Sequence, residues 1–254
     1  MKKEFPILEF DPDKNALINP QKEIKAIDIP VRCVICFFQD VINKLNQQKK
    51  LTRVATQKSE AGKHPIYVFE FKDEKLALFH PAVGAPISAG LLEEVIARGC
   101  KKFMVCGSAG VLDSSIARGH VLVPIAAVRD EGTSYHYLPP GREVSANPKA
   151  IHAIETVLKK AGIDYLLTKT WTTDAFYRET PKKIALRKSE GCLTVEMEAA
   201  ALFAVAQFRN VILGEILYGG DDVGGKEWNS RKWTKDKDMR KKFFWLAAEA
   251  CLEL

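Results

Sequence analysis

Short apolar runs alternate with more polar segments along the chain from residue 31 to residue 254. Apolar runs bounded by charged or turn residues predict buried strands. These strands are expected at residues 31–38, 67–71, 75–79, 102–106, 119–128, 166–171 and 211–218. The intervening segments predict helices at residues 40–48, 87–98, 148–161, 199–208 and 235–252, with a further short helix starting at Thr180 and Pro181.

Two of these helices carry recognisable ends. Asn147 and Pro148 supply an N-cap residue and a first-turn proline, and Gly162 ends the same helix. Gly99 follows Arg98 and is typical of the residue that ends a helix in a left-handed conformation. The sequence therefore fixes the limits of these two helices better than those of the others.

Strand, helix and strand recur without a linker or an internal repeat, which predicts a single α/β domain over residues 31–254. Its core is expected to be a central, mixed but largely parallel β-sheet flanked by helices. Residues 1–30 contain four prolines and scattered charges and are expected to form an extended N-terminal arm. Ligands of such sheets bind beyond the carboxyl ends of the strands, so the segments that follow strands are the candidate site.

Composition excludes several classes of protein. Hydrophobic residues make up 46% of the chain and charged residues 28%, as in ordinary globular proteins. The net charge of +6 is mild, so nucleic acid is not an expected partner. Most of the excess lies at residues 226–242, which predict a solvated helical face or, as the alternative, a rim that attracts phosphate. No run approaches the ~18 apolar residues that span a bilayer, and the first residues lack an apolar signal core. We expect a cytoplasmic protein without a membrane partner.

The six cysteines do not have zinc-ribbon or secreted-scaffold spacing, so no metal site is predicted. Cys33 and Cys36 form a C-x-x-C pair, but they lie within a predicted buried strand. A redox pair normally precedes a helix instead. We interpret the cysteines as buried free thiols, which suits a reducing compartment.

The most informative segment places Glu196, Met197 and Glu198 directly before an apolar helix. Carboxylates at the entrance of a buried helix are costly to desolvate unless hydrogen bonds satisfy them. The hydroxyls of a sugar diol are suitable donors for such carboxylates. The alternative is that both acids only complement the positive end of the helix dipole.

Two glycine-containing segments follow predicted strands. Gly107-Ser108-Ala109-Gly110 offers backbone N–H groups and the Ser108 hydroxyl to a phosphate or carboxylate, although a plain tight turn explains it equally well. Gly84 opens a helix whose first N–H groups could face the same anion.

Asp221 and Asp222 follow a strand and a Gly-Gly bend, where burial or a like charge raises the pKa of a carboxyl and suits it to act as a general acid. A simple Gly-Asp turn is the alternative. Phe176 and Tyr177 lie in a polar segment, where they either stack on a planar base or pin the segment to the core.

The order of these segments resembles the nucleoside phosphorylase superfamily of the hexameric purine and uridine type, which also contains nucleosidases. The resemblance covers roughly residues 30–250, and Glu196-Met197-Glu198 is its most specific part. Residues 128–137 are most similar to the uridine phosphorylases.

The resemblance implies a role for each candidate residue. Glu196, Met197 and Glu198 would bind the ribose, and Phe176 with Tyr177 would bind the base. Ser108 and Gly84 would bind phosphate, which acts as a co-substrate, and no other cofactor is implied. Asp221 would be the catalytic acid that protonates the departing base. Relatives build each pocket at a subunit interface, so a homodimer or a hexamer made of three dimers is expected, with His136 or Tyr137 near the contact.

The chain also departs from the family pattern. The Gly-Asp-Pro-x-x-Arg loop is replaced by Cys36-Phe37-Phe38-Gln39-Asp40, and Val105 stands where an arginine precedes the glycine loop. Arg129, Arg178, Lys63 or a residue of a neighbouring subunit is considered as a replacement for the two arginines. The function predicted first is phosphorolysis of a purine or pyrimidine nucleoside, with uridine among the candidates. Hydrolysis, with Asp40 activating water, and a catalytically silent nucleoside-binding protein are the alternatives.

Overall fold

The computed structural model describes residues 2–254. Its strands are β1 (Arg32–Cys36), β2 (Thr52–Ser59), β3 (Gly62–Phe71), β4 (Glu74–Phe79), β5 (Lys102–Val111), β6 (Val121–Asp130), β7 (Glu143–Ser145), β8 (Tyr165–Thr173), β9 (Cys192–Glu196) and β10 (Ile212–Asp222). Its α-helices are α1 (Pro20–Glu23), α2 (Gln39–Gln47), α3 (Ala85–Arg98), α4 (Pro148–Lys160), α5 (Pro181–Ser189), α6 (Ala199–Arg209) and α7 (Lys237–Leu252). Short 3-10 turns lie at Pro6–Leu8, Thr133–His136, Phe176–Arg178 and Trp233–Lys235.

The strands form one mixed sheet that closes on itself at one end. β5 pairs with β10, β10 with β6, β6 with β8, β8 with β9, and β9 with β5 again. The other strands extend from β5 in the order β1, β4, β3 and β2, and β7 pairs with β6. The predicted α/β domain with a central mixed sheet flanked by helices is confirmed, and the closure at one end is an addition to it.

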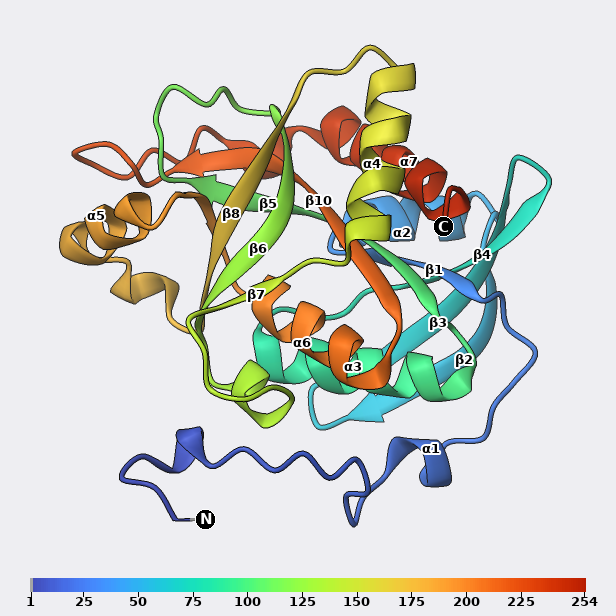
Figure 1. Ribbon diagram of the computed structural model, residues 1–254. Coiled ribbons are helices and arrows are strands. Elements are labelled where there is room, and N and C mark those ends of the chain that lie inside the picture. Colours follow the sequence, from blue (N-terminus) through green and yellow to red (C-terminus); the bar gives the residue numbers. More distant parts are fainter. Residues whose placement is uncertain (1) are drawn as a thin grey trace.

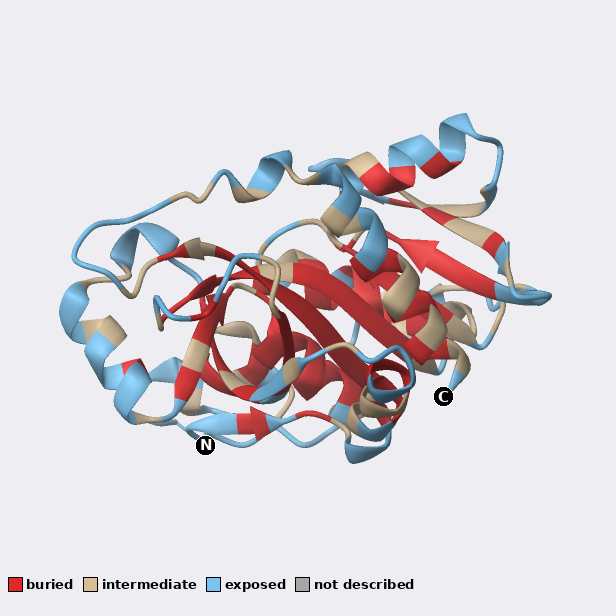
Figure 2. Cartoon of the chain, turned by 90° about the horizontal axis from the view of Figure 1, so that it is seen from above, coloured by how far each residue is buried: buried red, intermediate tan, exposed pale blue. Residues whose placement is uncertain are grey.

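Helices cover both faces of this sheet. α2, α4 and α7 pack on one face, and α3 and α6 pack on the other (Figure 1). Within β1, Cys33 and Ile35 join the core under α3 and α6, whereas Val34 and Cys36 join the core under α7. A strand that is covered on both faces has a continuous run of apolar residues in its sequence, and this run is what predicts β1. Figure 2 shows the buried residues concentrated along the central strands and the helices against them.

Local sequence signals hold where they were strongest. The Asn147 side chain accepts a hydrogen bond from the Lys149 N–H and caps α4, which starts at Pro148. Gly99 ends α3 with a φ of 134°, a conformation that favours glycine. All six cysteines are buried free thiols, as predicted.

The two glycine-rich segments for which a turn was one of the alternatives are instead parts of strands. Gly107 to Gly110 lie within β5, and β10 continues through Gly219 and Gly220 to Asp222. The tight-turn and Gly-Asp-turn interpretations are therefore wrong. The cause is tertiary pairing, because β10 pairs with β5 from Ile212 to Asp222, with a bulge between Gly219 and Asp222. A side chain at Gly219 would approach the Ala117 carbonyl oxygen to 3.1 Å, so close packing explains this glycine.

Strand β2 was not predicted. Its sequence from Thr52 to Ser59 is mostly polar, and most of its residues are exposed or only partly buried at the edge of the sheet. Residues 2–31 form a largely irregular segment that contains α1 and runs beside α3 and α6 (Figure 1). The Ile27 N–H donates to the Arg98 carbonyl at 3.1 Å and ties this segment to the end of α3. Across residues 2–254, every helix is too short or too polar to cross a membrane.

Candidate functional site

A cavity of about 910 Å³ opens where β1 and β9 end and where β5 and β10 run side by side. It brings together most of the residues that the sequence singled out. These are Ser108, Phe176, Tyr177, Glu196, Met197, Glu198 and Asp221. Gly110 lets the elements approach closely, since a Cβ atom there would lie 3.1 Å from Val195 Cγ1 and 3.5 Å from Asp221 Oδ1. Asp221 therefore lies against the strand that leads to Glu198.

Glu196 is held by the protein itself. Its Oε2 accepts hydrogen bonds from the Glu198 and Ala199 N–H groups, both at 2.6 Å, and its Oε1 accepts one from Thr172 Oγ1 at 2.6 Å. These are the free N–H groups at the start of α6, so Glu196 caps this helix. This agrees with the helix-dipole interpretation for Glu196, and its main effect is to fix the backbone that carries Glu198.

Glu198 is buried, and one of its oxygens is held by a backbone group. Its Oε1 accepts a hydrogen bond from the Gly84 N–H at 2.6 Å. Burial, reinforced by the nearby charge of Glu196, raises the pKa of Glu198 to about 8. The Gly84 amide, expected to face phosphate, is thus engaged by Glu198. Gly84 has a φ of 103°, which favours glycine, and its role in this geometry is to position the carboxyl.

Asp221 and Asp222 have separate surroundings. Asp222 is buried, pairs with Arg231 at 2.8 Å and accepts hydrogen bonds from Ser114 Oγ and the Gly224 N–H, so it holds the following loop. Asp221 faces the cavity and accepts a hydrogen bond from Trp228 Nε1 at 2.7 Å. Of the two adjacent acids, Asp221 is the one available to a ligand.

The cavity end beside Asp221 is rich in aromatic side chains. The rings of Phe176 and Tyr177 have centroids 4.1 Å apart, and these side chains are 51% and 88% exposed. Glu179 lines the cavity next to them, and burial together with the charge of Asp221 raises its pKa to about 7. This end combines planar rings with two carboxyls, which suits a flat heterocycle with polar edges.

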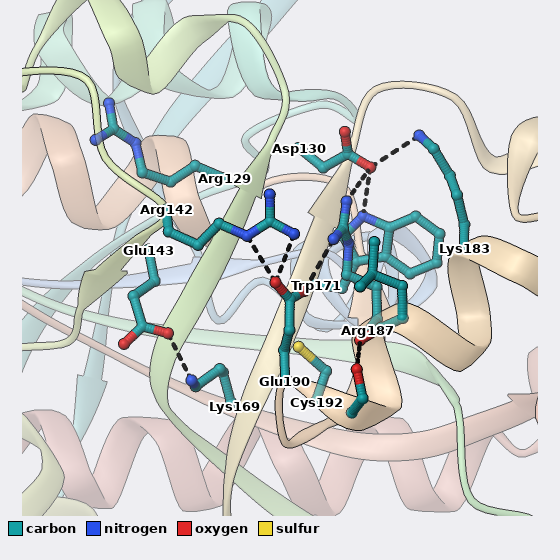
Figure 3. A network of polar contacts seen from close by, with 12 residues as sticks. Arg129, Asp130, Arg142, Glu143, Lys169, Trp171, Lys183, Arg187, Glu190 and Cys192 are labelled. Carbon is teal, nitrogen blue, oxygen red and sulfur yellow. Dashed lines mark hydrogen bonds and ion pairs between the residues drawn. The ribbon is translucent and has the colours of Figure 1, made fainter.

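A network of polar contacts joins α5, the helix that follows these rings in the chain, to β6 and β8 (Figure 3). Asp130 Oδ2 accepts from Lys183 Nζ at 2.9 Å, Arg187 Nη2 at 3.0 Å and Trp171 Nε1 at 2.9 Å. Lys183 and Arg187 belong to α5, which starts two residues after Glu179. The network fastens α5 to β6 and β8 and so fixes the place of the aromatic segment.

The opposite end of the cavity contains a half-buried arginine that sequence reasoning missed. Arg240, from α7, lines the cavity and donates to Asp40 Oδ1 at 2.9 Å and to the Tyr218 hydroxyl at 3.4 Å. Its guanidinium lies 5.5 Å from the Phe38 ring centroid. Tyr218 is paired in register with Ser108, so the guanidinium lies near the Ser108 position. In the sequence Arg240 is one of several basic residues near the start of α7, and nothing there distinguishes it.

The cations proposed as substitutes for the family arginines lie elsewhere. Arg129 donates to Ser134 Oγ and to the Pro139 carbonyl, both at 2.8 Å, and holds a loop. Arg178 and Lys63 are exposed and are not among the residues that line the cavity. Within residues 2–254, the cations on the cavity wall are Lys226 and Arg240. The same residues contain no cluster of His, Cys, Asp and Glu suited to a metal ion.

A second missed residue is Glu215, an acid in the apolar run that predicted β10. It is 2% exposed and lines the cavity, and its Oε2 makes no hydrogen bond within the described chain. Burial, with the charges of Glu196 and Glu198 added, raises its pKa well above the ordinary value. The signal was available in the sequence, because an unexplained carboxyl in a buried strand requires a partner.

The raised pKa values of these buried carboxyls predict how the stability of the fold depends on pH. The pKa of Glu198 is about 8 when folded and 4.5 ordinarily. Between these values the folded carboxyl keeps a proton that the unfolded chain has released, so the free energy of unfolding falls as pH rises. We expect E198Q to reduce this fall, measured by urea unfolding between about pH 5 and pH 8.5. E60Q, in the exposed turn between β2 and β3, should show the wild-type dependence of the free energy of unfolding on pH. If E198Q shows the same dependence as wild type, the raised pKa of Glu198 is contradicted.

The sequence of the chain is similar to those of known proteins. Residues 31–250 match the sequence model described as the phosphorylase superfamily. The chain is 28% identical over 157 residues to a guanosine phosphorylase from Halorubrum lacusprofundi, which covers 60% of this chain and 64% of that protein, less than two thirds of its length.

Solved structures share the fold. The crystal structure of a uridine phosphorylase from Vibrio fischeri has a TM-score of 0.73 at 23% identity, covering 89% of this chain and 92% of that one. The crystal structure of an AMP nucleosidase from Bacteroides thetaiotaomicron has a TM-score of 0.71 at 22% identity, covering 89% of each chain.

Proposed function

The chain is a member of the phosphorylase superfamily, and on that premise we propose that it is a nucleoside phosphorylase. It would cleave the N-glycosidic bond of a nucleoside with phosphate and release the free base and ribose 1-phosphate. The observation that carries the proposal is that Glu198 and Asp221 line the same cavity, with Phe176 and Ser108 on its walls. The 28% identity to a guanosine phosphorylase supports it.

The reaction needs charge stabilisation at two ends of the substrate. As the glycosidic bond breaks, the sugar becomes oxocarbenium-like and the base gains negative charge. Glu198, fixed by Gly84 and by the α6 cap, accepts hydrogen bonds from the sugar hydroxyls. Asp221 supplies a proton to the departing base, and the Phe176 ring packs on its face. Met197, between the two acids, lines the sugar site.

Phosphate would bind at the opposite wall, against Ser108 and Arg240. Arg240 reaches the cavity from α7, and it would supply a cation for phosphate in place of the two arginines of the family pattern. Its bond to Asp40 orients the guanidinium and leaves further N–H donors for an anion.

Replacing Arg240 with glutamine tests this phosphate site. A charge-assisted contact contributes about 1.5–3 kcal/mol, so R240Q should raise the KM for phosphate roughly 10- to 100-fold. The KM for the nucleoside should change much less, and R240K should retain part of the phosphate affinity because it keeps the charge. Initial rates at varied phosphate check this, and an unchanged KM for phosphate would remove Arg240 from the site.

Hydrolysis is the second candidate, because acidic residues outnumber basic ones on the cavity wall. The carboxyls there are those of Glu179, Glu196, Glu198, Glu215, Asp221 and Glu227, against the cations of Lys226 and Arg240. Each carboxyl that is ionised disfavours a phosphate dianion, an effect that grows with pH because the pKa values of Glu179, Glu198 and Glu215 are raised. Asp40, considered as the base that activates water, is paired with Arg240.

One assay decides between these functions. The protein is incubated with purine and pyrimidine ribonucleosides, with and without phosphate, and release of the base is followed. Release that depends on phosphate supports phosphorolysis, and equal release without phosphate supports hydrolysis. Binding of a nucleoside without release would leave a binding protein.

We further propose that a purine is the preferred base. Burial and the charge of Asp221 raise the pKa of Glu179 to about 7, and the two carboxyls lie on the same cavity wall, which matches a ring nitrogen that takes up a proton beside an N–H donor. Uridine remains in the assay because the fold is shared with a uridine phosphorylase.

We also propose a homodimer or a hexamer of three dimers, acting in the cytoplasm. Val83, Tyr177 and Trp228 are 65%, 88% and 67% exposed at the cavity wall, and a second copy could cover them. His136 is exposed, whereas Tyr137 packs on Phe208 of α6. Light scattering of the purified protein gives the number of subunits.

A further inference from the structure

Glu215 has no role in the function proposed above, although it occupies a costly position. It comes from the middle of β10, where its neighbour in register is Val105 of β5. Leu217, two residues further along the strand, also lines the cavity, so the Glu215 side chain and Leu217 point to the same face of the sheet. Glu215 therefore forms part of the cavity floor.

The partners expected of a buried carboxyl are missing. Glu215 is 2% exposed, its Oε2 has no hydrogen-bond partner, and no ion pair to it occurs among residues 2–254. Native proteins rarely leave such a group unsatisfied, and those that do often use it for a ligand. Replacement by an apolar residue would remove the desolvation penalty, so the free protein gains nothing from this carboxyl.

The ligand group that fits here is a hydroxyl. Burial, with the charges of Glu196 and Glu198 added, raises the pKa of Glu215 and so favours its protonated form, in which a carboxyl both donates and accepts hydrogen bonds. Glu196 is already saturated by the α6 N–H groups and by threonine hydroxyls. The carboxyls left for a sugar at this end of the cavity are those of Glu198 and Glu215.

We propose that Glu215 forms a hydrogen bond with one hydroxyl of the sugar diol and makes the site selective for ribonucleosides over deoxyribonucleosides. This inference rests on the proposed function, since it assumes that the sugar of a nucleoside binds beside Glu198. A ribonucleoside satisfies the buried carboxyl, whereas a substrate that lacks the hydroxyl leaves it unpaired against a CH₂ group. Sites built to bind a hydroxyl reject analogues without it far more strongly than apolar pockets reject an added one.

The test compares kcat/KM for a ribonucleoside with kcat/KM for its 2′-deoxy and 3′-deoxy analogues. Wild type should prefer the ribonucleoside to at least one analogue by roughly 100-fold or more. E215L should lower that preference about tenfold or more, mainly by losing activity on the ribonucleoside, and E215Q should retain most of it because an amide still forms hydrogen bonds. The analogue whose discrimination falls identifies the hydroxyl. E227L, which removes an exposed carboxyl from the mouth of the same cavity, should leave the preference unchanged.

Two further measurements distinguish a failure of the role proposed for Glu215 from a failure of the proposed function. E215L should unfold at a higher temperature than wild type, which shows that its altered selectivity does not come from misfolding. Dissociation constants for the same nucleosides, measured by calorimetry, report sugar selectivity without turnover. If wild type cleaves no nucleoside, the proposed function fails. If nucleosides are cleaved or bound but E215L keeps the wild-type preference against both analogues, the role of Glu215 is overturned.

Discussion

Replacing Asp221 with asparagine is expected to lower kcat for nucleoside cleavage by roughly 10²- to 10⁴-fold, the range supplied by general acid catalysis. The asparagine side chain keeps the size of aspartate and can still accept the hydrogen bond from Trp228 Nε1, so the local structure should persist. It cannot supply the proton that the departing base needs. The KM for the nucleoside should change only a few-fold, because the substrate contacts remain.

Steady-state kinetics with a purine ribonucleoside check this prediction. E60Q, on the exposed β2–β3 turn, serves as the matched control because it removes a carboxyl far from the cavity. Glu179 lies on the same wall as Asp221, so E179Q shows how much of the proton supply depends on the neighbouring acid. Wild-type kcat in D221N would remove Asp221 from the mechanism and leave Glu179 as the candidate acid.

Replacing Glu198 with glutamine should reduce kcat/KM for ribonucleosides roughly 100-fold or more in assays at about pH 8 and above, where the carboxyl is ionised and each lost charge-assisted hydrogen bond contributes about 1.5–3 kcal/mol. The Gly84 N–H can still donate to the amide oxygen, so the loop before α3 should keep its place. The amide lacks the negative charge that stabilises an oxocarbenium-like sugar. Nucleoside binding should therefore weaken and turnover should slow.

The kinetic pattern separates Glu198 from Asp221. E198Q should raise KM and lower kcat, whereas D221N should lower kcat alone. Thermal unfolding controls for a general loss of structure, and E198Q should be no less stable than wild type at about pH 8, where the buried carboxyl ionises. Wild-type kinetics on ribonucleosides in E198Q would reject its sugar-binding role.

Much of the fold could be predicted because local and tertiary preferences agree. The capping residue Asn147 and the terminal Gly99 set their helices, and the apolar runs of β1 and β5 identified strands buried on both faces. The errors arise where pairing overrides local preference. Glycines in β5 and β10 lie in extended strands because neighbouring strands need close approach there, and the polar β2 is held by its hairpin with β3.

The candidate site was only partly predictable for the same reason. Glu198 and Asp221 stand at strand ends, where sequence reasoning looks for ligands, and both line the cavity. Arg240 lies on a distant helix, and only the packing of α7 brings it to the cavity. Glu215 lies inside a strand that the sequence predicts from its apolar residues, so its carboxyl is not predicted as part of a site. The sequence predicts that Gly84 contacts phosphate, but in the structure its N–H donates to the Glu198 carboxyl.

The most direct test of the central claim is a crystal structure of the protein grown with a ribonucleoside. The account predicts the sugar hydroxyls within hydrogen-bond distance of Glu198, the base against Phe176, and Asp221 beside a ring nitrogen of the base. A nucleoside bound at another surface, or one in this cavity with its sugar away from Glu198, would contradict the account.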